Sequence, residues 1–120
     1  MKYMLLIYGN ERLWSSFSQD DFQTVVAETD AHNTALARSG ELVGAYGVGD
    51  QVLAKQVHID NGVPLVTDGP YIETKEYLAS FTIVDVESLD RALEIAAANP
   101  FARVGQVEVR PLMHEAAVDV

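Results

Sequence analysis

Hydrophobic and polar residues follow different periods along the chain, and each change of period marks a new element. Residues 2–8 (KYMLLIY) are apolar at odd and even positions alike, which is typical of a strand covered on both faces. Other short apolar or alternating runs predict further strands at 42–46, 56–60, 64–67, 77–86 and 105–111. Asn61-Gly62 lies between two of these runs and indicates a tight β-hairpin turn.

Two segments carry apolar residues at helical spacing. The first begins after Ser18, a preferred N-cap residue, and ends at Ser39-Gly40, where glycine is typical of a helix C-terminus. The second begins after Ser88 and ends at Asn99-Pro100. The stripe that we expect the first helix to pack against the rest of the protein is Phe22, Val26, Thr29, Asn33 and Leu36.

The order of these elements is β-α-β-β-β-α-β, which predicts an α+β domain over residues 1–120. It matches a ferredoxin-like βαββαβ core with one extra short β-hairpin. Both helices should cover one face of a mostly antiparallel sheet. The other face would keep apolar residues from the first strand and from 77–86, and a chain of this length has no further element to cover them. We therefore expect a homodimer in which two sheets pack face to face.

Composition and charge narrow the classes of partner. The 120 residues include 18 Asp and Glu against 8 Lys and Arg, a formal net charge of −10. Such a chain offers no cationic surface for phosphates, so we expect no nucleic-acid partner. No apolar run approaches the about 20 residues that span a bilayer. Because Met1-Lys2-Tyr3 leads into a strand without a cleavage site behind it, we expect no signal peptide and a cytoplasmic protein.

Metal and cofactor chemistry has little support in the sequence. The absence of cysteine excludes disulfides and thiolate nucleophiles. His32, His58 and His114 have spacings that match no metal-binding motif. We therefore expect neither a metal nor a cofactor.

The densest group of chemically active side chains is the string from Thr67 to Glu76 (TDGPYIETKE). Asp68-Gly69-Pro70 predicts a turn, in which the Asp68 carboxylate accepts backbone N–H groups. Beyond it, Lys75 could orient an anionic ligand or could form an ordinary surface ion pair with Glu73. The remaining candidates for ligand binding in this string are Tyr71 and Thr74.

His32 and Arg110 are candidates from other elements. His32 follows Glu28 by four residues, so that carboxylate could raise the imidazole pKa and orient a general base, or the two could form an exposed pair. Arg110 could hold a carboxylate, and it shares a face of its strand with Gln106 and Glu108. The polar face of 56–60 could join this face in a groove for an organic acid or lactone, or both could be solvated ends of the dimer interface.

Three strings of this chain resemble one known family, the DGPF-type branch of the YCII-related family. They are KYMLLIYG near the start, LVTDGPYIETKEYL in the middle and VEVRPLM near the end. Tyr71 stands where the DGPF-x-ETKE signature has Phe, and Ile95 stands where many relatives have Trp. The resemblance implies a dimeric α/β-barrel fold of the ferredoxin-like kind. Relatives include a lactone-processing dehalogenase with a proposed His–Asp active site, and members of the DGPF branch are associated with alternative sigma factors.

Two functions follow as hypotheses. The first is a dimer that binds a small organic acid or lactone-like molecule, with or without proton-transfer, lactone or dehalogenation chemistry. Its catalytic candidates are His32 and Asp68, and its ligand-binding candidates are Tyr71, Glu73, Thr74, Lys75 and Arg110. The second is a non-catalytic regulatory or adaptor module beside a sigma factor. A cleft with convergent polar groups would favour the first, and a cleft filled by side chains would favour the second.

Overall fold

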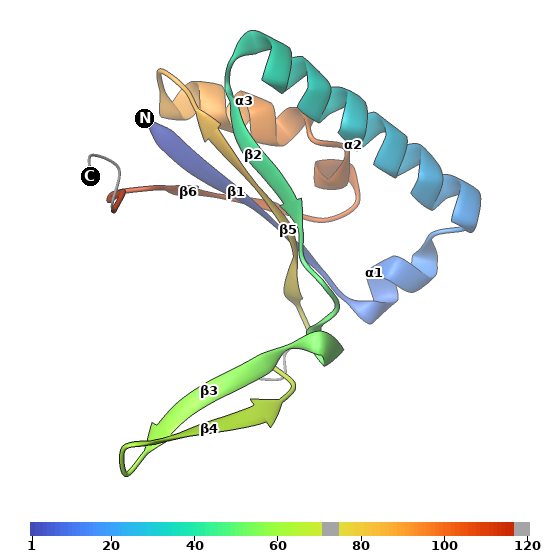
Figure 1. Ribbon diagram of the computed structural model, residues 1–120. Helices are drawn as coiled ribbons and strands as arrows, with labels where there is room; N and C mark the ends of the chain where they lie inside the picture. Colours follow the sequence, from blue (N-terminus) through green and yellow to red (C-terminus); the bar gives the residue numbers. More distant parts are fainter. Residues whose placement is uncertain (71–74, 117–120) are drawn as a thin grey trace.

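The computed structural model describes residues 1–70 and 75–116 (Figure 1). The strands in these residues are β1 (Lys2–Gly9), β2 (Leu42–Gly47), β3 (Lys55–Asp60), β4 (Val63–Asp68), β5 (Tyr77–Asp85) and β6 (Val107–Pro111). The α-helices are α1 (Glu11–Ser16), α2 (Gln19–Ser39) and α3 (Leu89–Ala98), joined by the 3₁₀ turns η1 (Gln51–Leu53) and η2 (Pro100–Arg103). None of the helices in the described part of the chain combines the length and hydrophobicity that a membrane span needs.

The main sheet has the strand order β2-β5-β1-β6, and each neighbouring pair is antiparallel. Helices α2 and α3 lie together on one side of this sheet (Figure 1). Taken in chain order, β1, α2, β2, β5, α3 and β6 form the βαββαβ core with both helices on one face. The predicted α+β, ferredoxin-like fold is therefore confirmed.

The hydrophobic core lies between α3, the C-terminal half of α2 and the covered face of the sheet. Opposite residues Tyr3 and Val84 on β1 and β5 belong to it, and Val84 is fully buried. Ile95 of α3 is 2% exposed and fills the space above them. The aliphatic side chain at this position thus serves packing.

The ends of α2 are set by the residues that the sequence indicated. The hydroxyl of Ser18 accepts a hydrogen bond from the Asp21 amide at 3.0 Å. Gly40 ends the helix with φ 82° and donates its amide hydrogen to Ala37. Ser88 caps α3 in the same way, by accepting from the Arg91 amide at 3.1 Å. These predicted helix boundaries are confirmed.

Helix α1 was not predicted from the sequence. Its N-cap is Asn10, whose side-chain oxygen accepts from the Leu13 amide at 2.6 Å. At six residues, the helix is too short for an apolar period to show in the sequence. It matters because it carries Trp14 back over the end of β1.

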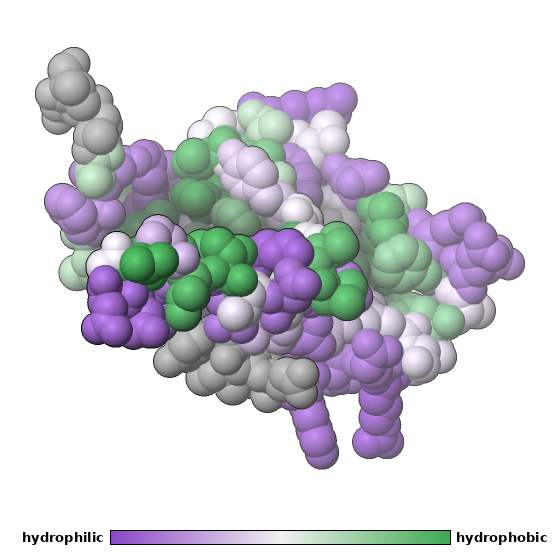
Figure 2. All heavy atoms as spheres, turned by 60° about the horizontal axis from the view of Figure 1, so that its bottom comes forward, coloured by the Kyte–Doolittle hydropathy of each residue, from purple (hydrophilic) through white to green (hydrophobic). Residues whose placement is uncertain are grey.

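The β3–β4 hairpin forms a separate two-stranded sheet that extends away from the main sheet (Figure 1). Its turn residues Asn61 and Gly62 both have positive φ, as the Asn-Gly signal predicts. β3 and β6 lie in different sheets, so the polar residues of 56–60 and 105–111 do not share one sheet face. Apolar side chains of the hairpin stay exposed, with Val57 at 68% and Val66 at 64%. Figure 2 shows hydrophobic residues among hydrophilic ones on this side of the molecule.

Candidate functional site

A cleft of about 660 Å³ lies between the N-terminal half of α2 and the part of the sheet below it. Strands β2 and β5 form its floor, and α1 and η2 contribute residues at one end. This volume falls in the range of clefts that hold small organic molecules. The cleft lies on the helix-covered face of the sheet, next to the core. Core side chains fill the space under the C-terminal half of α2, and the cleft lies under its N-terminal half.

The floor of the cleft follows from the size of the residues on β2 and β5. Opposite residues on the helix-covered face become smaller along the strands, in the order Leu42–Val84, Ala45–Thr82 and Gly47–Ser80. The first pair packs in or against the core, and the other two pairs line the cleft. Because α2 runs on over these small residues, a space remains beneath it that the chain does not fill.

One wall of the cleft is formed by the α2 stripe, whose side chains we expected to pack against the rest of the protein. Only the N-terminal part of the stripe lines the cleft. Leu36, at the C-terminal end of the stripe, is buried at 5% exposure. Phe22 and Val26, at the other end, keep 42% and 38% of their surface exposed and line the cleft. The helical spacing was thus predicted correctly, but the N-terminal half of the stripe surrounds a cavity instead of a core.

Aromatic rings form one end of the cleft. Trp14 of α1 packs edge-to-face against Phe22 and Phe101, with ring centroids 6.5 and 6.2 Å away. Gly9 makes room for the indole, since a Cβ at this position would lie 2.1 Å from Trp14 Cζ2. All three rings line the cleft and give it a flat, apolar end.

Polar groups of α2 face the same space. Asn33 lines the cleft, but its Oδ1 has almost no accessible surface and accepts no hydrogen bond among the described residues. The Thr29 hydroxyl donates to the Val25 carbonyl at 2.7 Å, so its oxygen can only accept from a ligand. The exposed carboxylates of Asp30 and Asp50 lie at the edge of the cleft. Asp30 and Asn33 were not predicted as site residues, although Thr29 and Asn33 interrupt an apolar stripe in the sequence.

The candidate His32 lies on the other side of α2, in a small cavity between α2 and α3. Burial, and then the charge of Arg91, lower the pKa of its half-buried imidazole. Of the two alternatives for Glu28, the one in which it raises this pKa is wrong, because the pKa is lowered. The Glu28 carboxylate instead pairs with Arg103 at 2.7 Å. The described residues hold no group of three or more His, Asp or Glu side chains with the geometry for a metal ion.

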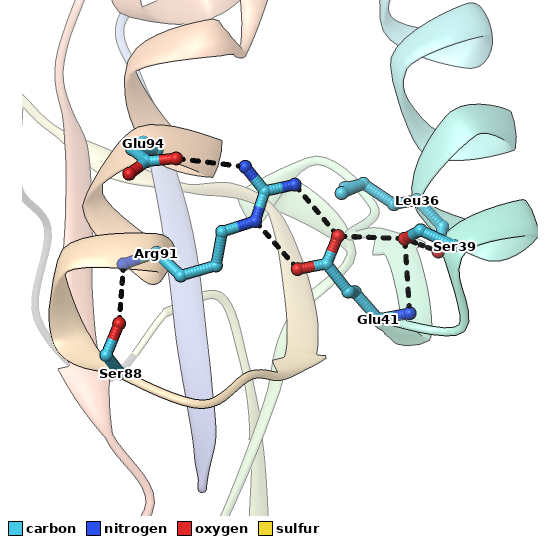
Figure 3. A network of polar contacts seen from close by, with 6 residues as sticks. All are labelled: Leu36, Ser39, Glu41, Ser88, Arg91 and Glu94. Atoms are coloured by element: carbon cyan, nitrogen blue, oxygen red, sulfur yellow. Dashed lines mark hydrogen bonds and ion pairs between the residues drawn. The ribbon is translucent and has the colours of Figure 1, made fainter.

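Arg91, whose charge lowers the pKa of His32, lies in a network of polar contacts (Figure 3). Its Nε and one terminal nitrogen donate to the two Glu41 carboxylate oxygens at 2.7 and 2.8 Å, and the other nitrogen donates to Glu94 at 3.1 Å. The Ser39 hydroxyl lies 2.8 Å from the same Glu41 carboxylate. Hydrogen bonds from Arg91 and then Ser39 lower the pKa of Glu41 to about 2. This network ties the end of α2 to α3 and positions no side chain in the cleft.

The candidate Asp68 lies at the end of β4, where its exposed carboxylate forms an ion pair with Lys55. The turn that follows has the predicted glycine with positive φ, Gly69 at 92°. The Gln56 side-chain amide holds this turn by donating to the carbonyls of Gly69 and Pro70, at 3.1 and 2.6 Å.

Of the other candidates in this string, Tyr71, Glu73 and Thr74 lie outside the described residues. Lys75 is exposed and lines a smaller hollow of about 440 Å³ beside α1, which Arg12 and Glu76 also line. Asn10 donates to the Glu76 carboxylate there at 2.7 Å. Lys75 therefore lies near another cation, which is compatible with the predicted contact to an anion.

Arg110 lies on β6 opposite Met4, and its side chain is exposed. Met4 belongs to the face of the sheet that the helices leave open, because its neighbours Tyr3 and Leu5 point into the core. The structure thus places His32, Asp68, Lys75 and Arg110 at four separate locations, none of which is the cleft.

An antiparallel βαββαβ core with a cleft under its first long helix defines the class of protein, a ferredoxin-like α+β domain. The chain belongs to the YCII-related domain family, which matches residues 1–116. An uncharacterised protein of Rhizobium meliloti (strain 1021) is 34% identical over 116 residues, which make up 93% of this chain and 92% of that protein. The match is to the YCII-related domain as a whole, so the DGPF branch stays a prediction.

One similar solved structure is 5-chloro-2-hydroxyhydroquinone dehydrochlorinase from Burkholderia phenoliruptrix AC1100, in complex with 2,5-dihydroxybenzoquinone. It is 16% identical to this chain, the TM-score is 0.49, and the similarity covers 96% of each chain. A likeness of this extent assigns neither substrate nor reaction to the present chain. The fold rests on the strand order and the position of the helices.

Proposed function

We propose that this protein binds a small organic molecule in the cleft under α2. The observation that carries the proposal is the cleft itself, about 660 Å³ of space between α2 and the small floor residues of β2 and β5 that the described side chains leave unfilled. Protein interiors are normally close-packed, so a space of this size with an apolar end is typical of a ligand site.

The residues that line the cleft support the same function. Ligand sites are mostly apolar with a few polar groups that fix orientation. Here Trp14 and Phe22 supply apolar surface, and Asp30 supplies a carboxylate within the same cleft. If the protein is an enzyme, Asp30 is the cleft residue that we propose as proton acceptor. His32 and Asp68, the earlier catalytic candidates, have no role at this site in the proposal.

The alternative function is the regulatory or adaptor module beside a sigma factor. It leads to the expectation that side chains fill the space between helix and sheet. A cleft of about 660 Å³ favours ligand binding over that alternative. A part for the 67–76 string in ligand binding remains a prediction of its own, which Lys75→Ala would test separately.

The test uses the single tryptophan of the chain, Trp14, which lines the cleft. A library of small neutral and charged compounds is screened by the shift of the Trp14 indole N–H resonance. We expect Ala45→Leu, which adds a side chain to the cleft floor, to weaken every hit by about tenfold or more, equivalent to about 1.4 kcal/mol. The matched control Ala31→Leu adds the same group on the exposed side of α2 and should leave the affinities unchanged.

Two results would contradict the proposal. One is a library in which no compound shifts the Trp14 resonance. The other is a set of hits that bind Ala45→Leu as tightly as they bind the unmodified protein.

A further inference from the structure

We propose that the β3–β4 hairpin binds a second copy of this chain, in addition to any contact between the two main sheets. None of its residues from 55 to 68 lines the cleft, so this surface does not depend on the proposed function. The sequence predicted the hairpin only as an extra element of the fold. Its apolar face, the surface area of the chain and the distribution of charge together give it a role in self-association.

One face of the hairpin is apolar and uncovered. The opposite pairs Val57–Val66 and Ile59–Pro64 share this face, because side chains alternate between the two faces of a strand. Val57, Ile59 and Val66 keep 68%, 58% and 64% of their surface exposed. The hairpin pairs with no other described strand, and a two-stranded sheet alone is at best marginally stable in water. A partner that packs on this face would stabilise the hairpin.

The chain exposes more surface than a self-contained monomer of its mass. Its accessible surface is 8489 Å², whereas about 6,400 Å² is typical of a globular monomer of 13.1 kDa. Its radius of gyration is 16.7 Å, against about 14 Å for a compact domain of 120 residues. If two copies covered this excess of about 2,000 Å² per chain, they would bury about 4,000 Å², within the about 2,000–5,000 Å² of obligate homodimers.

The open face of the main sheet supplies only part of this area. Leu6 on that face is 8% exposed, Phe81 and Ile83 are partly buried, and Tyr46 is 55% exposed. On the hairpin, by contrast, every residue of β3 and β4 except Gln56 is exposed. In Figure 1 the hairpin extends from the end of the main sheet, away from α2 and α3. A dimer that covers the excess surface must therefore include the hairpin.

The distribution of charge makes the hairpin suitable for self-association. The formal net charge of −10 makes two copies of the chain repel each other. Residues 55–68 contain one Lys and two Asp, a formal charge of −1 with His58 neutral. Lys55 pairs with Asp68 at the base of the apolar face. Two copies can therefore meet at this face with little of the repulsion that the rest of the chain would cause.

The first test measures self-association. Val66→Asp places a carboxylate on the apolar face of both hairpins in a pair, and we expect it to weaken the dimer by about a hundredfold or more. The matched control Thr67→Asp adds the same group at the next residue, which is also exposed but lies on the other face of β4. It should leave the dissociation constant unchanged. Sedimentation equilibrium over a range of chain concentrations gives both constants, and circular dichroism confirms that both variants fold.

The second test detects the contact in the unmodified protein. In dimers mixed from carbon-13-labelled and unlabelled chains, isotope-filtered NMR records nuclear Overhauser effects between the two subunits alone. We expect such effects from the methyl groups of Val57, Ile59 and Val66. Ile95, which is 2% exposed in the core, is the internal control and should show none.

Three results would contradict the proposal. One is a protein that remains a monomer at every concentration tested, which would leave the apolar face to a different protein. Another is a dimer that Val66→Asp and Thr67→Asp weaken to the same extent. The third is a dimer in which the hairpin methyl groups show no Overhauser effect to the partner. None of these results bears on ligand binding in the cleft, which the library screen with Trp14 tests separately.

Discussion

His32 shows how its neighbours set the behaviour of a single titratable residue. The imidazole is half-buried between α2 and α3, and its cationic neighbour is Arg91. Both burial and the Arg91 charge disfavour the imidazolium ion, so the pKa of His32 in the folded protein lies below its ordinary value of 6.5. The carboxylates of Glu41 and Glu94 line the same cavity, and both are paired with Arg91.

We predict that this residue makes the protein less stable in mild acid. Below pH 6.5 the unfolded chain binds a proton at His32 before the folded protein does, so protonation favours unfolding as the pH falls. Glu41, with a pKa of about 2, stays ionised across this range and does not mask the effect. Urea unfolding at a series of pH values should show a shallower loss of stability for His32→Gln than for the unmodified protein.

The exposed His58 provides the control for this measurement. His58→Gln removes an exposed imidazole from a strand of the hairpin and controls for the loss of one histidine as such. Equal slopes for all three proteins would show that the surroundings of His32 do not oppose its protonation.

Among the elements, α2 depends on its C-terminal glycine. Gly40 has φ 82°, and a Cβ added there meets no atom of the described residues within 4 Å. The cost of Gly40→Ala is therefore a cost of backbone conformation alone, about 1 kcal/mol. We predict a fall of the melting temperature by about 4 °C, measured by calorimetry.

Gly47 is the matched control for this substitution. An added Cβ there also meets no described atom within 4 Å, but its φ lies outside the left-handed region. Gly47→Ala should therefore leave stability unchanged or raise it slightly, because alanine restricts the unfolded chain. If both variants lose the same stability, left-handed geometry is not what Gly40 supplies.

The elements were predictable from the sequence where the signal was local. Ser18 and Gly40 mark the ends of α2, and Asn61-Gly62 marks the hairpin, because each satisfies or permits a specific backbone geometry. Helix α1 was not predicted, because its six residues are too few to show an apolar period.

The candidate site was less predictable, because it depends on register. Ala45 and Gly47 are ordinary strand residues until their pairing with Thr82 and Ser80 places all four beneath α2. A sequence does not state which residues of distant strands lie opposite each other. The signal it did contain was the pair of polar residues in the α2 stripe, Thr29 and Asn33, which both line the cleft.

In the molecule as a whole, the face of the main sheet away from the helices is apolar over β1, β5 and β2, while Glu108 and Arg110 of β6 lie at one edge of it. Met4 and Leu6 of β1 lie opposite Ile83 and Phe81 of β5 on this face. Tyr46 of β2 extends this apolar surface. Its ring centroid lies 5.3 Å from that of Phe81, and the residue is 55% exposed. In Figure 1 both long helices lie on the opposite side. A contiguous apolar sheet face of this kind is typical of an interface.

We therefore propose a homodimer in which two such faces pack together about a two-fold axis. Light scattering should give about twice the 13.1 kDa of one chain at micromolar concentration. Tyr46→Asp should shift the protein to monomers, because a twofold axis brings the buried carboxylate into the interface twice. Since Tyr46 is more than half exposed in one chain, the monomer should keep its circular dichroism spectrum.

The hairpin offers a second exposed apolar surface that could form the dimer interface on its own instead. Val57, which is 68% exposed, lies on it, and Val57→Asp tests this alternative. A dimer that survives Tyr46→Asp and is lost in Val57→Asp would place the interface on the hairpin, and the sheet-to-sheet arrangement would be wrong.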